Sequence, residues 1–385
     1  MIDALAFHEW PSTATLADYL DSGWREIVMR PGDRGGPIQV RSQWLYRNPL
    51  GAKQADAWPA EGVPGSDLAT LRAQLLDHEG AERVVLGYEE GLLAMGVSHY
   101  HLARAVGRAA NQWTIAEWLE RDERLHGLVL ICSAVPEDAA ADVREYGRHE
   151  RMVGVAMGVN GLGRPFGHAA YLPIYEAAAE LDLPIVLQIG SDGVSALDST
   201  PVAGGLPATY GEYAAWGVQA LTGHIGSMIT QGLFDRFPNL RVMVAGGGAT
   251  WVAAYLWRLD FWFKTNSKEV PWLLRPPSEV FLERVRLGTL SLESPRQPER
   301  LATALGTVAG FDELLMYTSG YPSSIAEPPA AIRARLPEGW HERVFGANAD
   351  EFFRWPGRAR RAGAGPDAGA ATATAAAQTT SEKGA

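Results

Sequence analysis

The sequence predicts an α/β fold with the element count of a (β/α)₈ barrel. Eight short apolar runs, each of four to seven residues and rich in Val, Ile or Leu, recur along the chain. Such runs are typical of parallel strands that are buried on both faces. Eight strands with helices between them fit a TIM barrel, although the pattern alone also allows a doubly wound sheet. The runs span residues 2–8, 83–86, 127–132, 152–157, 184–188, 241–245, 284–287 and 313–318.

Helical patterns lie between most of these runs. Residues 170–181 are rich in Ala and Glu and stop before Pro184, which cannot continue a helix. Farther along, apolar side chains recur at i, i+4, i+8 and i+11, which places them on one face of a helix. These side chains are Trp251, Tyr255, Leu259 and Trp262.

Composition and charge restrict the classes of partner. The chain has 385 residues, is 46% hydrophobic and carries a formal net charge of -11. An acidic body disfavours nucleic acid and anionic membranes, because both require clustered Lys and Arg. The single cysteine, Cys132, excludes an internal disulfide and is expected to be a buried thiol. Without a signal peptide pattern or an apolar run of about 18 residues, the sequence predicts a cytoplasmic protein.

Two segments fall outside the repeat of strands and helices. Residues 31–66 are rich in Gly, Pro and Trp and are predicted to form an irregular insertion after the first strand. Such a loop either covers the mouth of a barrel or is a plain surface excursion. Residues 357–385 consist mostly of Ala, Gly, Thr and Arg, which predicts a disordered tail.

A second line of evidence comes from six sequence blocks, which together resemble the amidohydrolase-related family. This is the branch of the metal-dependent amidohydrolase superfamily that contains aromatic-acid decarboxylases and C–C, C–O and C–N bond hydrolases. The resemblance covers nearly all of residues 1–356 and implies the TIM barrel over the doubly wound sheet. The blocks are NQWTIAEWLERDERLHG at 111–127, YLPIYEAAAELDLP at 171–184, GLFDRFPNLRVMV at 232–244, WRLD at 257–260, VPWLLRPPSE at 270–279 and GANADEFFRW at 346–355.

The resemblance also implies a divalent metal at the top of the barrel. In the family, the ligands are a D-x-H or H-x-H pair after the first strand, a His after the fifth and an Asp in an S-D-Y-P-H motif after the eighth. An acidic residue or a His after the sixth strand assists. Borderline and hard cations need such anionic oxygens and imidazoles converging from several strands.

At the corresponding positions, this sequence lacks most of these ligands. The first-strand pair is assigned to Ala6 and His8, the fifth-strand position to Gln188 and the sixth-strand position to Gly246. The eighth-strand motif is SGYPS at 319–323, with Gly320 in place of the aspartate. One imidazole and one neutral amide do not neutralise a catalytic zinc or manganese ion. The sequence therefore predicts no metal and no other cofactor at the mouth.

Two histidines are the catalytic candidates. His8 is predicted to act as a base or to bind an anion, because imidazole titrates near neutral pH; the alternative is a relic that is satisfied by backbone carbonyls. His224 lies in a helical stretch before the sixth strand, at a place where the family also has a His. It is either a general acid or base, or a side chain that fixes a helix against the barrel.

Four further residues are predicted to bind substrate. Gln188 offers a donor and an acceptor, or it simply fills the space of the lost ligand. Arg284 stands near the seventh strand and would hold a carboxylate with two parallel hydrogen bonds, or it pairs with Glu283 on the surface. Ser319 and Tyr321 would supply hydroxyls, although both also belong to the turn geometry of the family.

The glycine run at 246–248 follows a strand and precedes a helix, which invites comparison with a phosphate-binding loop. It lacks the G-x-G-x-x-G spacing and the P-loop lysine. Nucleotide binding is therefore not expected.

Three functions are compatible with the sequence. The first is an enzyme of hydrolase, decarboxylase or lyase type that acts without the usual metal on a small carboxylated or aromatic substrate. The second is an inactive paralogue that partners or regulates a metal-bearing homologue. As partners, a second copy of the chain or a related amidohydrolase is expected, in a homodimer or a heterodimer. The third is a metallohydrolase with ligands from elsewhere, such as Asp3, Asp192 or the insertion.

Overall fold

The computed structural model describes residues 1–29, 53–97, 99–158, 162–188 and 209–355. Its single sheet has eight strands in the order β1-β2-β3-β4-β5-β6-β7-β8, and every pair of neighbours is parallel. All eight predicted strands are confirmed, with ends that differ by a few residues. They are β1 Ile2–Phe7, β2 Arg83–Gly87, β3 Leu125–Leu130, β4 Met152–Met157, β5 Ile185–Leu187, β6 Val242–Val244, β7 Val285–Gly288 and β8 Leu315–Met316.

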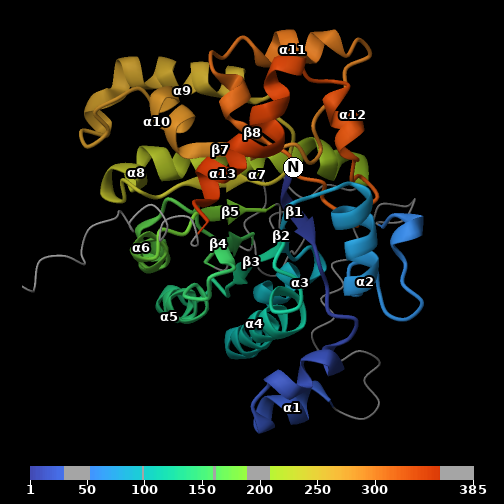
Figure 1. Ribbon diagram of the computed structural model, residues 1–385. Helices are drawn as coiled ribbons and strands as arrows, with labels where there is room; N and C mark the ends of the chain where they lie inside the picture. Colours follow the sequence, from blue (N-terminus) through green and yellow to red (C-terminus); the bar gives the residue numbers. More distant parts are fainter. Residues whose placement is uncertain (30–52, 98, 159–161, 189–208, 356–385) are drawn as a thin grey trace, which may run out of the picture.

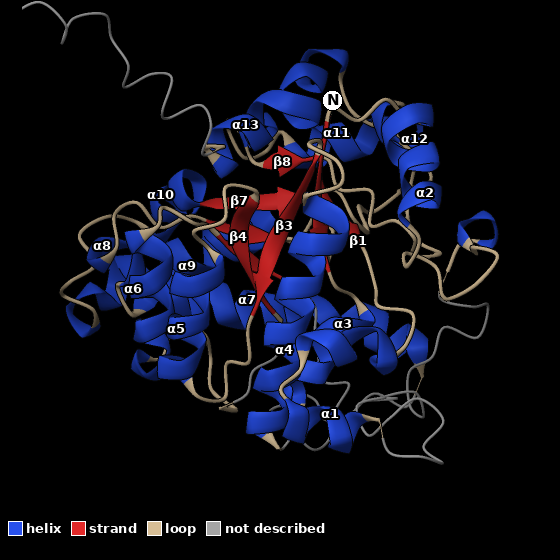
Figure 2. Ribbon diagram, turned by 60° about the horizontal axis from the view of Figure 1, so that its bottom comes forward, coloured by secondary structure: helices blue, strands red, loops and turns tan. Residues whose placement is uncertain are grey.

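Helices surround this sheet on the outside, as Figures 1 and 2 show. The predicted helix at 170–181 is α6, and the apolar face that begins at Trp251 belongs to α9. The helices are α1 Ser22–Val28, α2 Leu68–Leu71, α3 Glu90–Leu93, α4 Tyr100–Thr114, α5 Pro136–Tyr146, α6 Leu172–Glu180, α7 Tyr210–Thr230, α8 Leu233–Arg236, α9 Val252–Asn266, α10 Pro277–Arg284, α11 Glu299–Leu305, α12 Pro329–Arg333 and α13 Asn348–Phe353. No helix in these ranges is both long and apolar enough to cross a membrane.

Backbone hydrogen bonds between β1 and the β8 region close the barrel. Ala4 N–H donates to the Tyr317 carbonyl at 2.8 Å, and Gly320 N–H donates to the Leu5 carbonyl at 3.0 Å. With this closure, the fold is the expected (β/α)₈ barrel, in which catalytic groups lie at the carboxyl ends of the strands.

Apolar side chains pack in two separate layers. The larger layer lies between the strands and the surrounding helices, and a smaller one fills the barrel interior. Phe352, Phe353 and Trp355 of the α13 region belong to the interior layer. The Trp355 ring also contacts the His126 ring near the start of β3, with centroids 4.6 Å apart and planes tilted by 55°, so this region covers the amino-terminal end of the barrel.

The parts of the chain that lie outside the repeat are only partly described. Residues 53–66 of the predicted insertion run beside the β8 end of the barrel, where Gln54 N–H donates to the Pro322 carbonyl. Residues 30–52 of that insertion, and the tail predicted at 357–385, lie outside the described residues.

Cys132 is buried, as expected.

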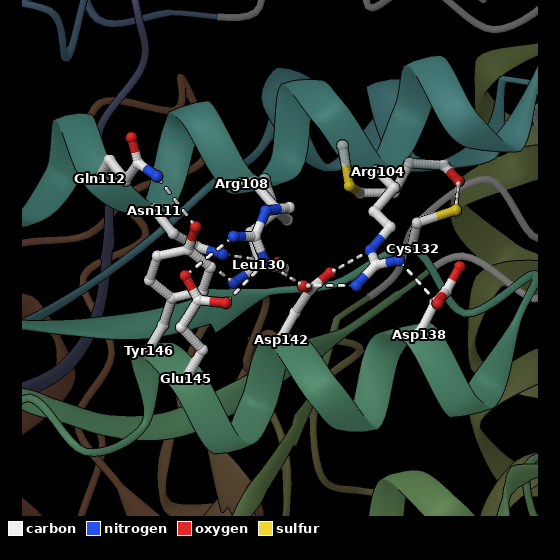
Figure 3. A network of polar contacts seen from close by, with 11 residues as sticks. Arg104, Arg108, Asn111, Gln112, Leu130, Cys132, Asp138, Asp142, Glu145 and Tyr146 are labelled. Atoms are coloured by element: carbon white, nitrogen blue, oxygen red, sulfur yellow. Dashed lines mark hydrogen bonds and ion pairs between the residues drawn. The ribbon is translucent and has the colours of Figure 1, made fainter. Parts of the chain in front are cut away.

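Ion pairs join α4 to α5 on the outside of the barrel (Figure 3). Asp142 is buried and accepts hydrogen bonds from Arg104 at 3.0 and 3.1 Å and from Arg108 at 2.7 Å. Arg108 also pairs with Glu145, whose side chain is half exposed. The buried carboxylate therefore joins two helices through charge-assisted hydrogen bonds.

We expect Asp142→Asn to lower the free energy of unfolding by about 2 kcal/mol, because the amide keeps the shape and loses the charge that two guanidinium groups need. Glu145→Gln, at the exposed end of the same network, should cost less than about 1 kcal/mol. Urea denaturation of both variants measures the two values. Equal losses would contradict the central role of Asp142.

Candidate functional site

The inner and outer faces of β1 are set by an irregularity in its pairing with β2. Asp3 pairs with Val84 and Ala6 pairs with Leu86, so β1 has one residue more than β2 over this interval. This extra residue has the effect of a β-bulge and shifts the alternation of faces. Beyond it, Leu5 and Phe7 belong to the interior layer, whereas Ala6 belongs to the outer layer.

This register corrects the assignment of the first-strand pair. Ala6 and His8 were expected to face the metal position, but both lie on the outer side of β1. The residues that face the barrel axis are Leu5 and Phe7, and neither can coordinate a cation. The prediction failed because a bulge reverses faces without leaving a trace in the apolar pattern.

His8 lies in a fully buried aromatic cage between β1, β2 and α4. Its ring stacks on Tyr88 and Trp113, with centroid distances of 4.3 and 5.6 Å, and meets the edge of Trp118 at 5.2 Å. Trp118 belongs to the π-helical segment Ile115–Leu119, which directly continues α4.

Both ring nitrogens of His8 make hydrogen bonds. Nδ1 donates to the Gly87 carbonyl at 2.8 Å, and Nε2 lies 2.8 Å from the Thr114 hydroxyl, from which a neutral ring accepts. Burial lowers the pKa of His8 to about 4. These contacts match the alternative of a histidine that is satisfied within the protein.

Gln188 occupies the centre of the mouth. Its Nε2 donates to the Tyr88 carbonyl at 3.1 Å. Gln188 follows β5 and Tyr88 follows β2, and these strands are not neighbours in the sheet. The side chain therefore crosses the barrel interior. Its Oε1 is buried and has no hydrogen-bond partner, which makes it an unsatisfied acceptor on the barrel axis.

Leucine side chains fill the space beside the glycines of the mouth. A Cβ on Gly320 would lie 2.3 Å from Leu290 Cδ1, and a Cβ on Gly87 would lie 2.7 Å from Leu5 Cδ1. Leu290 is also the nearest side chain to Gly246, at 3.7 Å. Two of the positions at which the family implies metal ligands, Gly246 and Gly320, thus border an apolar plug.

The described residues do not fit the metal that the family resemblance implies. Leu5 and Phe7 are the interior-facing side chains of the first strand, and the neutral amide of Gln188 crosses the interior from β5 to the Tyr88 carbonyl after β2. Within the described ranges, no group of three His, Cys, Asp or Glu side chains is arranged to hold a metal ion. Asp192, an alternative ligand in the third function considered above, lies outside those ranges.

The glycine run at 246–248 leads into α9, whose amino-terminal region already carries a carboxylate of this chain. Glu293 accepts hydrogen bonds from Ala249 N–H at 2.8 Å and from the Thr250 hydroxyl at 2.6 Å. An internal carboxylate therefore occupies the position that a phosphate would take at a helix amino terminus.

Ser319 and Tyr321 lie in the turn after β8 and are both buried. Ser319 Oγ accepts from Tyr321 N–H at 3.1 Å, and Ser319 N–H donates to Asp3 Oδ1 at 2.9 Å. Burial raises the pKa of the Asp3 carboxyl to about 7. Asp3 and Ser319 thus help to join β1 to β8, while the Tyr321 hydroxyl and Asp3 Oδ2 are buried without a hydrogen-bond partner.

Unlike His8, which directly follows β1, His224 lies on α7. Its Nδ1 accepts from Phe166 N–H at 3.1 Å, and its ring stacks on Phe166 at 4.0 Å. These contacts fix the segment after β4 against α7. They agree with the packing role, and they also orient the imidazole, as a catalytic role requires.

Arg284 lies at the opposite end of the barrel from Gln188. It is the last residue of α10 and directly precedes β7, so its position is amino-terminal to the strand. The guanidinium donates to the Pro238 carbonyl and pairs with Glu283 at 2.9 Å. The expected location at the mouth is therefore wrong, because α10 extends up to the strand and Val285 begins it.

Three residues that shape the mouth could not be identified from the sequence: Leu5, Phe7 and Leu290. Nothing in their residue type distinguishes them from ordinary core residues. Leu5 and Phe7 could have been found only by moving the assigned first-strand pair one residue toward Asp3, from Ala6 and His8 to Leu5 and Phe7.

We expect His8 to make the folded state sensitive to acid. Its pKa falls from 6.5 to about 4 on folding, so its contribution is present above pH 6.5 and is lost as the pH falls toward 4. Between pH 7 and pH 5, wild type should lose about 2 kcal/mol more unfolding free energy than His8→Phe, which retains an aromatic ring but does not titrate. Urea denaturation at both pH values measures this difference. An identical pH dependence would show that His8 is not buried as a neutral ring.

Comparison with solved structures places this barrel among known folds. A 5-carboxyvanillate decarboxylase from Sphingomonas paucimobilis has a TM-score of 0.63 and 22% identity, covering 92% of this chain and 100% of the other. A dihydroxybenzoic acid decarboxylase from Polaromonas sp. JS666, solved with manganese and 2-nitroresorcinol, has a TM-score of 0.61 and 17% identity, with coverage of 92% and 97%. An amidohydrolase from Mycobacterium avium subsp. paratuberculosis has a TM-score of 0.64 and 17% identity, with coverage of 91% and 97%. At these identities, the likeness shows the fold.

Sequence comparison establishes the family. A search of curated protein sequences finds no match. The family described as Amidohydrolase matches residues 86–355, about seven-tenths of the chain. This match agrees with the eight-stranded barrel and with the sequence blocks found above, and the chain belongs to the amidohydrolase family.

Proposed function

We propose that this protein binds a small aromatic, carboxylated molecule at the barrel mouth and acts on it without a divalent metal. The observation that carries the proposal is the amide of Gln188, which crosses the barrel axis and leaves its Oε1 without a partner. Leaving a buried acceptor unpaired costs about 1–3 kcal/mol. A hydroxyl or protonated carboxyl group on a ligand would remove that cost.

The surroundings of Gln188 suit an aromatic ring. Leu5, Phe7 and Leu290 supply apolar surface, and the hydrogen bond to the Tyr88 carbonyl fixes which end of the amide is available. Small-molecule sites commonly combine apolar walls with a few oriented polar groups. Two of the three solved structures described above are decarboxylases, of 5-carboxyvanillate and of dihydroxybenzoic acid, which are both hydroxylated aromatic acids.

Chemistry on such a molecule requires a group that titrates, which Gln188 does not. His8 is a poor candidate, because both its nitrogens are bonded and its pKa is low. In our proposal, His224 performs acid–base work. Its Nδ1 accepts a backbone hydrogen bond, so the neutral ring carries its proton on Nε2. The reaction would be of hydrolase, decarboxylase or lyase type.

A second candidate is favoured by the packing of Leu290 against Gly320 and of Leu5 against Gly87. These contacts fill the mouth of the barrel rather than leaving it open. On this reading, the protein is an inactive paralogue that associates with, and regulates, a metal-bearing member of the family.

Ligand binding to the metal-free protein tests the first proposal. We expect 2,6-dihydroxybenzoate or 5-carboxyvanillate to bind in isothermal titration calorimetry, and Gln188→Leu to weaken binding at least about tenfold. Gln74→Leu is the matched control, because Gln74 also has a buried Oε1 without a partner but lies outside the barrel, with Nε2 on the Asp56 carbonyl. It should leave binding unchanged.

Elemental analysis of the purified protein tests the metal-free part of the proposal. We expect zinc and manganese far below one equivalent per chain. One equivalent of either metal, with activity that is lost on chelation, would overturn this part. Absence of both binding and turnover, together with co-purification of a metal-bearing relative, would favour the inactive paralogue.

A further inference from the structure

A largely buried lysine lies at the rim of the barrel mouth. The backbone of Lys53 forms an isolated antiparallel bridge with Ser323, in the turn after β8. Its side chain extends toward β2, where Nζ lies 2.5 Å from Oε2 of Glu89. The residue thus spans the carboxyl end of β1, which lies between β8 and β2. This is the end of the barrel at which enzymes of this fold carry their catalytic groups.

The carboxylate partner of this lysine is close to the group that holds Gln188. Glu89 directly follows Tyr88, whose carbonyl accepts from Gln188 Nε2 at 3.1 Å. A buried carboxylate fixes the same loop, because Glu9 accepts from Glu89 N–H at 2.7 Å and from Gly91 N–H at 2.9 Å. The ion pair and the Gln188 amide are therefore held by one short stretch of chain after β2.

Lysine is a rare residue in this chain. Of its 34 basic residues, four are lysines, at positions 53, 264, 268 and 383. Elsewhere in the described ranges, ion pairs such as Arg104–Asp142 and Arg335–Glu327 use a guanidinium group. A guanidinium stays charged, whereas an ammonium can release its proton. An arginine would serve as well or better for adhesion alone, so the lysine at position 53 adds the capacity to transfer a proton.

The two partners of the ion pair differ in their access to solvent. The Lys53 side chain is 10% exposed and the Glu89 side chain is 35% exposed. The ammonium is thus largely shielded from water, while the carboxylate that it contacts reaches solvent. A proton that leaves Nζ for a bound molecule can be replaced from water through Glu89, which is the arrangement that a general acid requires.

We propose that the Lys53 ammonium donates a proton to carbon in the decarboxylation of the aromatic acid that Gln188 binds. An Nζ–H bond breaks, and an electron pair of the ring forms a C–H bond at the carbon that carries the carboxylate. The C–C bond to the carboxylate then breaks, its electron pair restores the aromatic ring, and CO₂ leaves. Glu89 passes a proton from water to the amine, so each turnover consumes one proton from solvent. This inference rests on the proposed function and adds a second titrating group to His224.

Hydrogen exchange at carbon tests the donor without requiring decarboxylation. The probe is resorcinol, the ring that remains when 2,6-dihydroxybenzoate loses its carboxylate. It is incubated with the full-length protein in D₂O, and the proton at C2 is followed by NMR. We expect wild type to accelerate the loss of this signal over the rate without protein. Lys53→Met and Lys53→Arg should each lower the protein-dependent rate at least about 100-fold.

The arginine variant separates proton transfer from charge. A guanidinium keeps the positive charge beside Glu89 but does not release a proton. We therefore expect Lys53→Arg to retain the melting temperature of wild type and its calorimetric affinity for 2,6-dihydroxybenzoate. Lys264→Arg is the matched control, because Lys264 is exposed on α9, and it should leave the exchange rate unchanged.

The outcomes distinguish this inference from the proposed function. Exchange by Lys53→Arg at the wild-type rate, or binding of 2,6-dihydroxybenzoate by wild type without exchange of resorcinol, would overturn the inference and leave the proposed function intact. Loss of both binding and exchange in Lys53→Arg would assign the amine to ligand binding and would equally overturn it. Failure of wild type to bind 2,6-dihydroxybenzoate would refute the proposed function, and this inference with it.

Discussion

The extra residue in β1 decides how the rest of the mouth is built. Because β1 gains one residue on β2 between Asp3 and Ala6, Leu5 and Phe7 turn toward the axis. Asp3 then reaches the backbone of the β8 turn, and its carboxylate supports the closure of the barrel. His8 is turned outward by the same shift, into an aromatic cage that needs a neutral ring.

In the barrel interior, Gln188 makes an uncharged hydrogen bond at the fifth-strand position, where the family resemblance implies a metal ligand. A divalent cation is stable only among several anionic or imidazole ligands. An amide requires only one acceptor and one donor, and Gln188 already has the first of these in the Tyr88 carbonyl. The side chains beside Gln188 are the apolar Leu5, Phe7 and Leu290. The barrel interior is thus organised by shape and a single directional contact rather than by charge.

The sequence predicted the architecture well and the site poorly, for physical reasons. A continuous apolar run indicates a strand that is buried on both faces, and all eight strands of the barrel have such a run. For this reason, all eight strands could be predicted. The direction of each side chain depends on pairing with a neighbouring strand, which one sequence does not display. This explains why His8 was assigned to the wrong face and Arg284 to the wrong end of β7. Gln188 directly follows β5, whose pairing with β6 is regular, and its role in substrate binding stays a prediction.

The packing of Leu290 against Gly320 limits which residues this part of the barrel can accept. Gly320 has a φ of +66° and no room for a Cβ beside Leu290. An aspartate at this position would meet both steric conflict with Leu290 and unfavourable backbone geometry. A side chain larger than hydrogen at position 320 would therefore require a smaller residue at position 290 as well. The two positions are coupled by their shared volume, so neither can be varied freely while the other stays as it is.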